Sequence, residues 1–394
     1  MRIQNVTPFG IDLTDVKYIT EDVHAGLLER SQLAVDDVLM TITGRIGTCS
    51  VVTSDVLPAN INQHIVRMRI NSRLSPRFLA AYLNSDLGQT LSNRGVTGTT
   101  RLALDYDSIR AIPVPEVSSD IQAQLVTGIE AANQRRAAAF READTLLAGM
   151  DEVVRNALNL PTPTITRKSV FTVNAKAAFS SRFDPEYHNP FYTQRVDALR
   201  KLPHDTLENI VEFSSETWDG KVFFEDTFPY IEISGVSLKT GEYETTETPT
   251  DEAPSRAKMV VRAGDIIIST TRPHRGAIAT IRDLAIASTG FCVLRKILRN
   301  DVSREYLQWV MMNDYVLYQF MQRSSGGNYP AITADELKKV LIPLPSEAVQ
   351  KAIVGEVRSR QGQAAQLKRE AEMEWAAKAR FEIELLKSEV SDNG

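Results

Sequence analysis

Cysteine and histidine are scarce in this sequence of 394 residues, which contains two cysteines and five histidines. Cys49 and Cys292 are isolated from each other and from any histidine, so the sequence indicates neither a disulfide framework nor a zinc site. We interpret both cysteines as small buried side chains. The histidines show no metal-ligand spacing, so we expect no metal in this chain. They are His24, His64, His188, His204 and His274.

Long apolar runs and an excess of basic residues are also lacking. No stretch approaches the roughly 18 uncharged apolar residues that a membrane-spanning helix requires. The first residues, Met1 to Val6, lack the apolar run and cleavage site of a secretory signal, so we expect a soluble, cytoplasmic protein without a membrane partner. The net charge of −5 argues against coating nucleic acid by bulk electrostatics. Any DNA binding must therefore be local or shared with a partner.

Catalytic motifs are missing as well. There is no phosphate-binding loop of a nucleotide-driven motor, and no glycine-rich strand-to-helix loop for a methyl donor. The segment His188-Asn189-Pro190-Phe191 is one proline short of the Asn-Pro-Pro-aromatic signature of amino-methyltransferases. Glu336-Leu337-Lys338 comes nearest to the carboxylates and lysine of a nuclease, but a surface helix end explains it better. We therefore expect no catalytic site and no cofactor in this chain.

What the sequence does contain is an internal repeat with an offset of 228 residues. The segment Leu33 to Thr41 has the same character as Val261 to Ser269, with Asp37 and Asp265 in equivalent places. In both copies an acidic turn precedes a short β-branched apolar run, which predicts a turn followed by a buried strand. A glycine follows each strand, Gly47 in the first copy and Gly276 in the second.

Three further features occur twice. Ser75 and Ser303 each precede an apolar segment and predict N-capped helices. The alternating prolines of Ile112-Pro113-Val114-Pro115 return in Ile342-Pro343-Leu344-Pro345 and predict the end of a strand. Gln122 and Gln350 each open a long helical segment with a heptad-like apolar stripe. Such helices would reach roughly 60 Å, too long to bury against one small domain, so we expect them to pack on each other.

The predicted order is module, helix, linker, module, helix. Module one covers residues 1–118, the first spacer helix 119–158, the linker 159–178, module two 179–346 and the second spacer helix 347–390. The predicted fold class is α/β (α+β), with two tandem mixed α/β domains separated by two long antiparallel coiled-coil helices.

This duplicated pattern resembles the specificity subunits of type I restriction-modification systems. The resemblance rests on the strand-and-glycine block, the Ile-Pro-x-Pro and the glutamine-led helices, each present in two copies. It implies two target-recognition domains that each read half of a split double-stranded DNA site, within a non-catalytic subunit. The implied partners are methyltransferase subunits that bind S-adenosylmethionine and motor-nuclease subunits that use ATP and Mg²⁺.

Two features depart from the family pattern. The family has Glu before the helix-opening Gln, whereas this sequence has Ile121 and Val349. Module two also has about fifty residues, from roughly Phe179 to Pro229, ahead of Tyr230, whereas the matching strand of module one is Met1 to Val6 itself. Module one therefore lacks its opening segment in this sequence, and we expect its half-site to be short or degenerate.

Base recognition requires side chains with paired donors and acceptors on turns or helix ends. In module two, the turn 270–276 and the loop 324–330 offer such groups, and a turn near Trp218 offers a lysine. Solvated turns and plain connecting loops are the alternatives. The DNA-binding candidates of module two are Lys221, Arg272, His274, Arg275, Asn328 and Tyr329.

Module one offers a strand edge near residues 60–65 and the loop 94–101, which lacks acidic residues. The DNA-binding candidates there are Arg45, Asn62, Gln63, Arg94 and Arg101. We also predict that apolar helix residues bind partners, namely Leu125, Ile129, Leu146, Met150, Ile353, Val357, Leu367 and Leu385. Two rival functions remain open: a protein-binding coiled-coil scaffold without DNA recognition, and a catalytic methyltransferase fragment.

Overall fold

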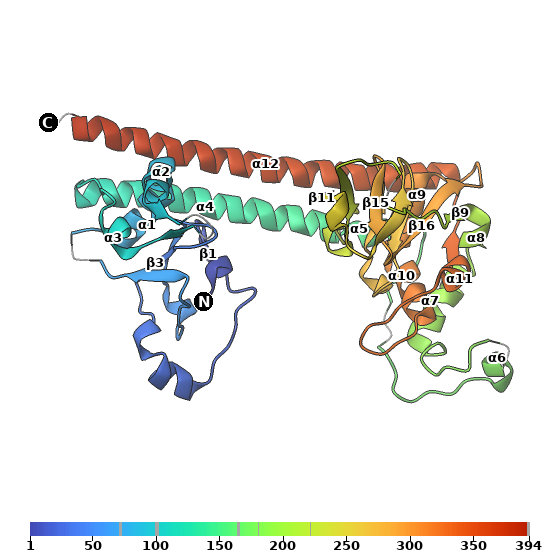
Figure 1. Ribbon diagram of the computed structural model, residues 1–394. Coiled ribbons are helices and arrows are strands. Elements are labelled where there is room, and N and C mark those ends of the chain that lie inside the picture. The colour runs from blue at the N-terminus through green and yellow to red at the C-terminus, as the bar shows by residue number, and fades with distance from the viewer. Residues whose placement is uncertain (71–72, 99–101, 164–165, 180, 221, 392–394) are drawn as a thin grey trace. The chain divides into compact units, whose positions relative to one another are not determined.

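The computed structural model describes residues 1–70, 73–98, 102–163, 166–179, 181–220 and 222–391, with the backbone alone for residues 177 and 381–391. The chain divides into two compact units of mixed helices and strands (Figure 1). Unit 1 consists of Met1–Glu142 and Gln366–Gly394, and unit 2 of Ala143–Ala365. The predicted mixed α/β class is confirmed. Within the described residues, every helix falls short of the apolar length needed to span a membrane.

Unit 2 is built around two four-stranded sheets. One is antiparallel throughout, in the order β14-β13-β16-β9, and the other has the order β11-β10-β15-β12 with β10 and β15 parallel. The strands are β8 (His204–Thr206), β9 (Val211–Ser214), β10 (Thr227–Ile231), β11 (Thr246–Pro249), β12 (Ala257–Val261), β13 (Ile266–Ser269), β14 (Ile278–Thr280), β15 (Ala285–Ser288), β16 (Phe291–Ile297) and β17 (Leu341–Pro343).

The helices of unit 2 pack on the first of these sheets. The core between them contains Ile266 and Ile268 of β13 and Tyr306, Val310 and Phe320 of the helices. The helices are α5 (Met150–Ala157), α6 (Ala175–Phe179), α7 (Pro190–Leu199), α8 (Leu207–Ile210), α9 (Arg304–Met311), α10 (Asp314–Arg323) and α11 (Ala334–Lys338), with short η5 (Ile233–Gly235), η6 (Thr250–Glu252) and η7 (Pro273–Arg275).

Unit 1 contains a smaller version of the same arrangement, with a three-stranded antiparallel sheet in the order β4-β3-β5. Val38 and Met40 of β3 face a core beneath helix α1, and Leu39 faces a second core. The elements are η1 (Ile3–Asn5), β1 (Val6–Thr7), β2 (Gly10–Ile11), η2 (Val23–Leu27), η3 (Glu29–Ser31), β3 (Val38–Thr41), β4 (Cys49–Val51), η4 (Ser54–Val56), β5 (Ile65–Met68), α1 (Pro76–Asn84), α2 (Asp86–Arg94), β6 (Val96–Thr97), β7 (Ala103–Leu104) and α3 (Tyr106–Arg110).

The sequence repeat is also a repeat of hydrogen bonds. The buried Gln350 accepts from the Ser303 backbone N–H at 3.1 Å and donates to the carbonyls of Asp301 and Pro345. The buried Gln122 makes the same three contacts with groups 228 positions earlier: the Ser75 N–H and two backbone carbonyls. The glutamines therefore fasten each long helix to the loop before α1 or α9.

Local predictions in both modules are confirmed. The predicted strands are β3 and β13, and all their residues are buried. Ser75 accepts a hydrogen bond from the Phe78 N–H and Ser303 one from the Tyr306 N–H, as N-capping residues do. Cys49 and Cys292 are free and buried, and burial raises the pKa of both thiols, that of Cys292 to about 11.

The second copy of Ile-Pro-x-Pro ends a strand, but the first does not. Strand β17 pairs with β8, and Ile342 is fully buried. In unit 1, residues 112–115 form no strand, Ile112 is half-buried and Pro113 is exposed. The strand predicted there is therefore wrong, because pairing requires a neighbour such as β8. The strand β16 of unit 2 corresponds to β5 of unit 1, since each pairs with the central buried strand. In unit 2, β9 pairs with the other edge of β16, whereas among the described residues β5 lies at the edge of its sheet.

The long helix predicted over 119–158 is present but bent. Helix α4 (Ser119–Ala148) meets α5 at Gly149, and helical hydrogen bonds continue across this residue: the Gly149 N–H donates to the Thr145 carbonyl and the Val153 N–H to the Gly149 carbonyl, each at 3.2 Å. The Arg360 side chain lies against Gly149, with Nη1 3.4 Å from its carbonyl, and would have to shift to admit a side chain there. Helix α12 (Glu347–Ser391) is continuous.

Both long helices contribute segments to each unit. Within unit 1, Arg135 pairs with Glu374 at 2.6 Å, and Lys368 lies 5.4 Å from the Phe140 ring centre, so these segments run antiparallel. Within unit 2, Met150 and Val154 share a core with Ile353 and Val357. Their packing as a coiled coil remains a prediction.

Candidate nucleic-acid interface

Strand β13 delivers the turn 270–276 to the surface of unit 2. The turn begins at Arg272, whose φ of 49° lies in the left-handed region, and ends at Gly276, with a φ of 78°. A non-glycine residue in this region carries a cost of order 1–3 kcal/mol, so the surroundings must hold it. They do so because the Arg272 N–H donates to the Pro330 carbonyl at 2.7 Å. The turn is thus fixed from outside its own sequence.

The turn and the loop 324–330, predicted separately, form a single surface. Thr271 forms a β-bridge with Ala331, and the Ile332 N–H donates to the Thr270 carbonyl at 2.9 Å. The Arg272 guanidinium lies over the Tyr329 ring, 4.5 Å from its centre, and Tyr329 is 70% exposed. This stacking orients the Arg272 guanidinium while most of the Tyr329 side chain stays exposed to solvent. We call residues 270–276 and 324–331 the reading surface.

The remaining candidates on the reading surface differ in charge. Arg275 and Asn328 are exposed. His274 is half-buried, and burial, assisted by Arg275 and Arg272, lowers its pKa. Its Nδ1 is buried without a hydrogen-bond partner among the described residues. The imidazole is therefore neutral at pH 7 and can donate or accept, but adds no positive charge for a phosphate.

Lys221 lies outside the described residues. The turn that leads to it is anchored in the core: Trp218 is 2% exposed, its Nε1 donates to the Val222 carbonyl at 2.6 Å, and its ring packs against Phe228. Gly220 has a φ of 90°, which favours glycine. The described residues on either side of position 221 are thus held by a buried tryptophan.

Unit 1 repeats the framework of the reading surface with different side chains. Thr43 bridges Ala103, and the Leu104 N–H donates to the Ile42 carbonyl at 3.0 Å, each group 228 positions before its counterpart in unit 2. The left-handed position of Arg272 is occupied by Gly44, with a φ of 68°. The next residue, Arg45, is exposed and donates from Nη2 to the carbonyls of Ile3 and Gln4 at 3.3 and 3.4 Å.

Asn62 and Gln63 lie in a turn before β5, not on the strand edge that their alternating pattern predicts. The Asn62 Oδ1 accepts from the His64 N–H at 3.2 Å, a local bond that turns the chain away from an extended course. The Gln63 side chain is exposed. His64 Nδ1 lies 3.0 Å from the Thr43 hydroxyl, so this turn adjoins the one that carries Arg45.

The loop 94–101 is described in part. Arg94 is the exposed last residue of α2. Arg101 lies outside the described residues.

The candidate partner-binding residues of the helices are mostly buried within this chain. Leu125, Met150, Ile353 and Val357 are at most 5% exposed, so in this structure they hold the helices to the modules and offer no open surface to a partner. Ile129, Leu146 and Leu367 are half-buried. Leu385 lies in α12, and its side chain is not described.

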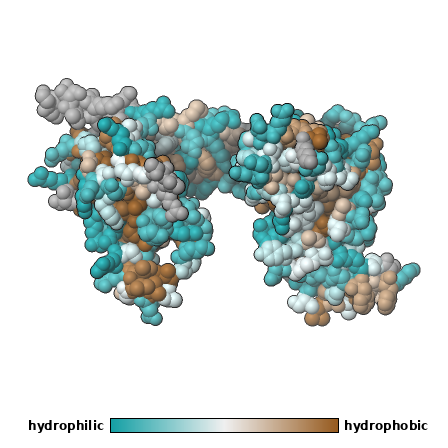
Figure 2. All heavy atoms as spheres, viewed as in Figure 1, coloured by the Kyte–Doolittle hydropathy of each residue, from teal (hydrophilic) through white to brown (hydrophobic). Residues whose placement is uncertain are grey.

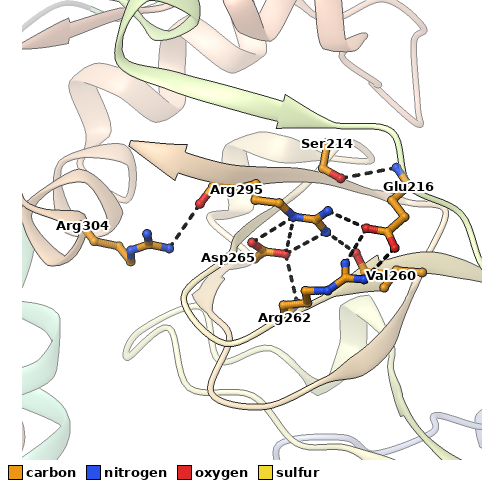
Figure 3. A network of polar contacts seen from close by, with 7 residues as sticks. All are labelled: Ser214, Glu216, Val260, Arg262, Asp265, Arg295 and Arg304. Carbon is orange, nitrogen blue, oxygen red and sulfur yellow. Dashed lines mark hydrogen bonds and ion pairs between the residues drawn. The ribbon is translucent and has the colours of Figure 1, made fainter. Parts of the chain in front are cut away.

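A charged network at the start of β13, at the opposite end of that strand from the reading surface, was missed by the sequence reasoning (Figure 3). Asp265, 2% exposed, accepts from Arg295 at 3.1 Å and from the Arg262 N–H at 3.0 Å. Glu216 pairs with Arg262 and Arg295, which lower its pKa to about 2. These contacts fix the turn that leads into β13. The repeat could have revealed part of the network: Arg69 donates from Nε to Asp37 at 3.3 Å, as Arg295 does to Asp265, and the strand pairing places these two arginines at equivalent positions.

The chemistry available at the reading surface is that of binding. It offers a stacked guanidinium, a second exposed arginine, an amide and a neutral imidazole, all of which suit base edges or phosphates. Within the described residues, no group of three or more His, Cys, Asp or Glu side chains could hold a metal ion.

Comparison with known proteins indicates the function of the domain that carries the reading surface. Residues 205–356 match the family model of the type I restriction modification DNA specificity domain. This chain carries a type I DNA specificity domain. Its function is the recognition of DNA, and the domain family is a specificity family and not a catalytic one. The specificity domain spans β8 to the first turns of α12 and includes the reading surface and its charged network.

Among solved structures, the chain is similar to one described as showing complex assembly and conformational transition of the type I R-M system, at 19% identity, 90% coverage of this chain, 82% of that chain and a TM-score of 0.47. It is also similar to the HsdS subunit from Thermoanaerobacter tengcongensis, at 19% identity, 98% coverage of this chain, 88% of that chain and a TM-score of 0.39. A third similar structure is the type I restriction-modification S subunit from M. genitalium, at 14% identity, 98% coverage of this chain, 90% of that chain and a TM-score of 0.40. No curated protein matches the chain.

Proposed function

We propose that this chain reads a bipartite DNA site for a type I restriction-modification complex, with each module recognising one half-site. The observation that carries the proposal is the reading surface itself: two loops far apart in sequence are tied together, and they present Arg272, Arg275 and Asn328 from a domain of the DNA specificity family. The repeat of the supporting hydrogen bonds in unit 1 argues for a second reader.

The side chains suggest how a half-site is read. A guanidinium whose plane is set by stacking on Tyr329 loses little freedom when it donates two parallel hydrogen bonds to a guanine edge. Arg275 is exposed and suits either a base or a phosphate. His274, neutral at pH 7, can pair with a base edge. In unit 1 we assign these roles to the exposed Arg45, Gln63 and Arg94, of which Arg45 lies in the turn that corresponds to 270–276.

Chemistry on the DNA belongs to other subunits under this proposal. Methyltransferase subunits would supply S-adenosylmethionine, and motor-nuclease subunits would supply ATP and Mg²⁺, in the cytoplasm. The net charge of −5 supports shared DNA binding, because an acidic chain gains affinity for DNA from a partner that neutralises further phosphates.

The test is selection from a random duplex pool by the full chain, co-expressed with methyltransferase subunits. We expect enrichment of one sequence with two defined halves. Arg272→Ala or Arg275→Ala should then weaken specific binding by about 1–3 kcal/mol and relax one base position if the side chain reads a base. A phosphate contact would instead weaken all sequences alike and flatten the salt dependence.

A pool that shows no enrichment would overturn the proposal. That result would instead favour the rival function, a coiled-coil scaffold that binds proteins without recognising DNA.

A further inference from the structure

A cationic and aromatic segment precedes the specificity domain in unit 2. Between positions 167 and 183 the sequence contains four basic residues and no acidic one. Arg167 is paired with Glu186 at 2.6 Å and Arg182 with Asp184 at 3.3 Å. Lys168 and Lys176 have exposed side chains, and the described residues give neither an ion-pair partner. These two lysines are thus available to an anionic ligand.

Two phenylalanines of this segment are exposed and stacked on each other. Phe179 is 80% exposed and Phe183 82%, with ring centres 5.8 Å apart and planes inclined by 20°. Figure 2 shows apolar side chains gathered on the surface where Figure 1 draws α6. Covering such a pair with another molecule would remove apolar surface from water, which favours binding at this place.

The segment is anchored to the base of the reading surface. Arg182 donates from Nη1 to the Arg323 carbonyl at 2.6 Å and from Nη2 to the Ser324 carbonyl at 3.4 Å. Gln322 donates from Nε2 to the Tyr187 carbonyl at 2.7 Å. Arg323 ends α10, and the loop that carries Tyr329 starts at Ser324. A ligand that lies on that loop therefore comes close to the phenylalanine pair.

We infer that Phe179 and Phe183 form an apolar wedge that enters the base stack of duplex DNA, with Lys168 and Lys176 on the flanking phosphates. The inference rests on the proposed function and extends it. DNA is the occupant because Lys168 and Lys176 are exposed without an ion-pair partner among the described residues, and because Arg182 ties the segment to the start of the reading-surface loop. A methyltransferase must take its target base out of the stack, and an apolar side chain that fills the opened step lowers the cost.

The experiment uses the full chain with methyltransferase subunits and a duplex that carries the selected site, with 2-aminopurine placed at successive positions. For Phe179→Ala/Phe183→Ala we expect affinity to fall by about 5- to 150-fold, because stacking on an aromatic is worth that much per base. The 2-aminopurine fluorescence that marks an unstacked step should be lost, while the slope of log Kd against log salt stays constant.

Lys168→Ala/Lys176→Ala should do the reverse, lowering the salt slope by about 2 while the fluorescence is kept. Leu298→Ala is the matched control: it removes an apolar side chain of unit 2 that is 51% exposed, and should change neither quantity. Phe179→Leu/Phe183→Leu keeps apolar volume without rings and should bind with intermediate affinity. Because leucine keeps the apolar volume, the leucine variant also shows whether the alanine variant lost binding through a folding defect.

Unchanged affinity and fluorescence in the alanine variant would overturn the inference, and so would loss of methyltransferase subunits with DNA binding intact, which would make the pair a protein contact. If the unmodified chain selects no site, the proposed function fails. If it selects a site and Arg272→Ala impairs it while the phenylalanine variants do not, only the wedge fails.

Discussion

Replacing Gln350 tests whether the repeat is held together by its buried glutamines. The side chain is 2% exposed and makes three hydrogen bonds, to the Ser303 N–H and to the carbonyls of Asp301 and Pro345. Gln350→Ala removes all three and leaves a cavity between the start of α12 and the loop before α9. Each lost bond costs about 1 kcal/mol net, and more where water cannot replace it. We therefore expect a loss of about 2–4 kcal/mol in the free energy of unfolding of unit 2.

The assay is urea unfolding followed by tryptophan fluorescence. Trp218 and Trp309 lie in unit 2 and Trp375 in unit 1, so a Trp375→Phe background reports unit 2 alone. In thermal unfolding, the loss corresponds to a fall in Tm of roughly 5–15 °C, at about 2–4 °C per kcal/mol for a unit of this size. Gln122→Ala should destabilise unit 1 by a similar amount, followed through Trp375.

The matched control is Gln363→Ala. Gln363 lies on the same helix and is exposed, with one hydrogen bond to the Ser359 hydroxyl. Its loss should stay within about 0.5 kcal/mol, as for most surface changes. If Gln350→Ala proved no more destabilising than this control, the glutamines would be incidental to the repeat and the structural reasoning would be refuted.

Two further predictions concern the charged network and the division of labour between modules. Because Arg262 and Arg295 lower the pKa of Glu216 from 4.5 to about 2, the carboxylate contributes stability above pH 4.5 and loses it as the pH falls toward 2. Screening at a side chain that is 33% exposed limits this to about 1–2 kcal/mol, and Glu216→Gln should reduce the pH dependence of urea unfolding between pH 5 and 3 by this contribution, while the other carboxylates keep theirs. Exchanging residues 179–346 for another such module should change one half of the selected site and leave the other half and the spacing as they were; a change in both halves would contradict independent modules.

Sequence reasoning succeeded where a feature is local and duplicated. The caps at Ser75 and Ser303, the strands after Asp37 and Asp265 and the glutamine-led helices each depend on a few neighbouring residues, and a second copy at one offset removes chance matches. Gln122 and Gln350 illustrate why: the same three backbone groups surround both, so the same side chain is required twice.

It failed where the outcome depends on distant chain. The bridge between Thr271 and Ala331 joins two loops, and neither loop's sequence shows that they meet. The strand predicted at Ile112 needs a partner that unit 2 has in β8 and unit 1 lacks among its described residues. Apolar stripes on the long helices did not show which residues pack within the chain: Leu125 and Ile353 are buried in its own cores, and the partner contacts stay a prediction.

The two units share a framework but not a reading surface of one chemical kind. In both units, a β-bridge to a downstream alanine, Ala103 or Ala331, holds the turn that follows β3 or β13. The side chains on the two turns differ, so the same backbone framework supports different side chains. Where unit 2 has Arg272, stacked on Tyr329, unit 1 has Gly44, and the side chain next to it, Arg45, is directed to backbone carbonyls of its own module. If both units read DNA as proposed, the oriented Arg272 of unit 2 gives that unit the stronger means of base recognition, and we predict that its half-site is the better defined of the two.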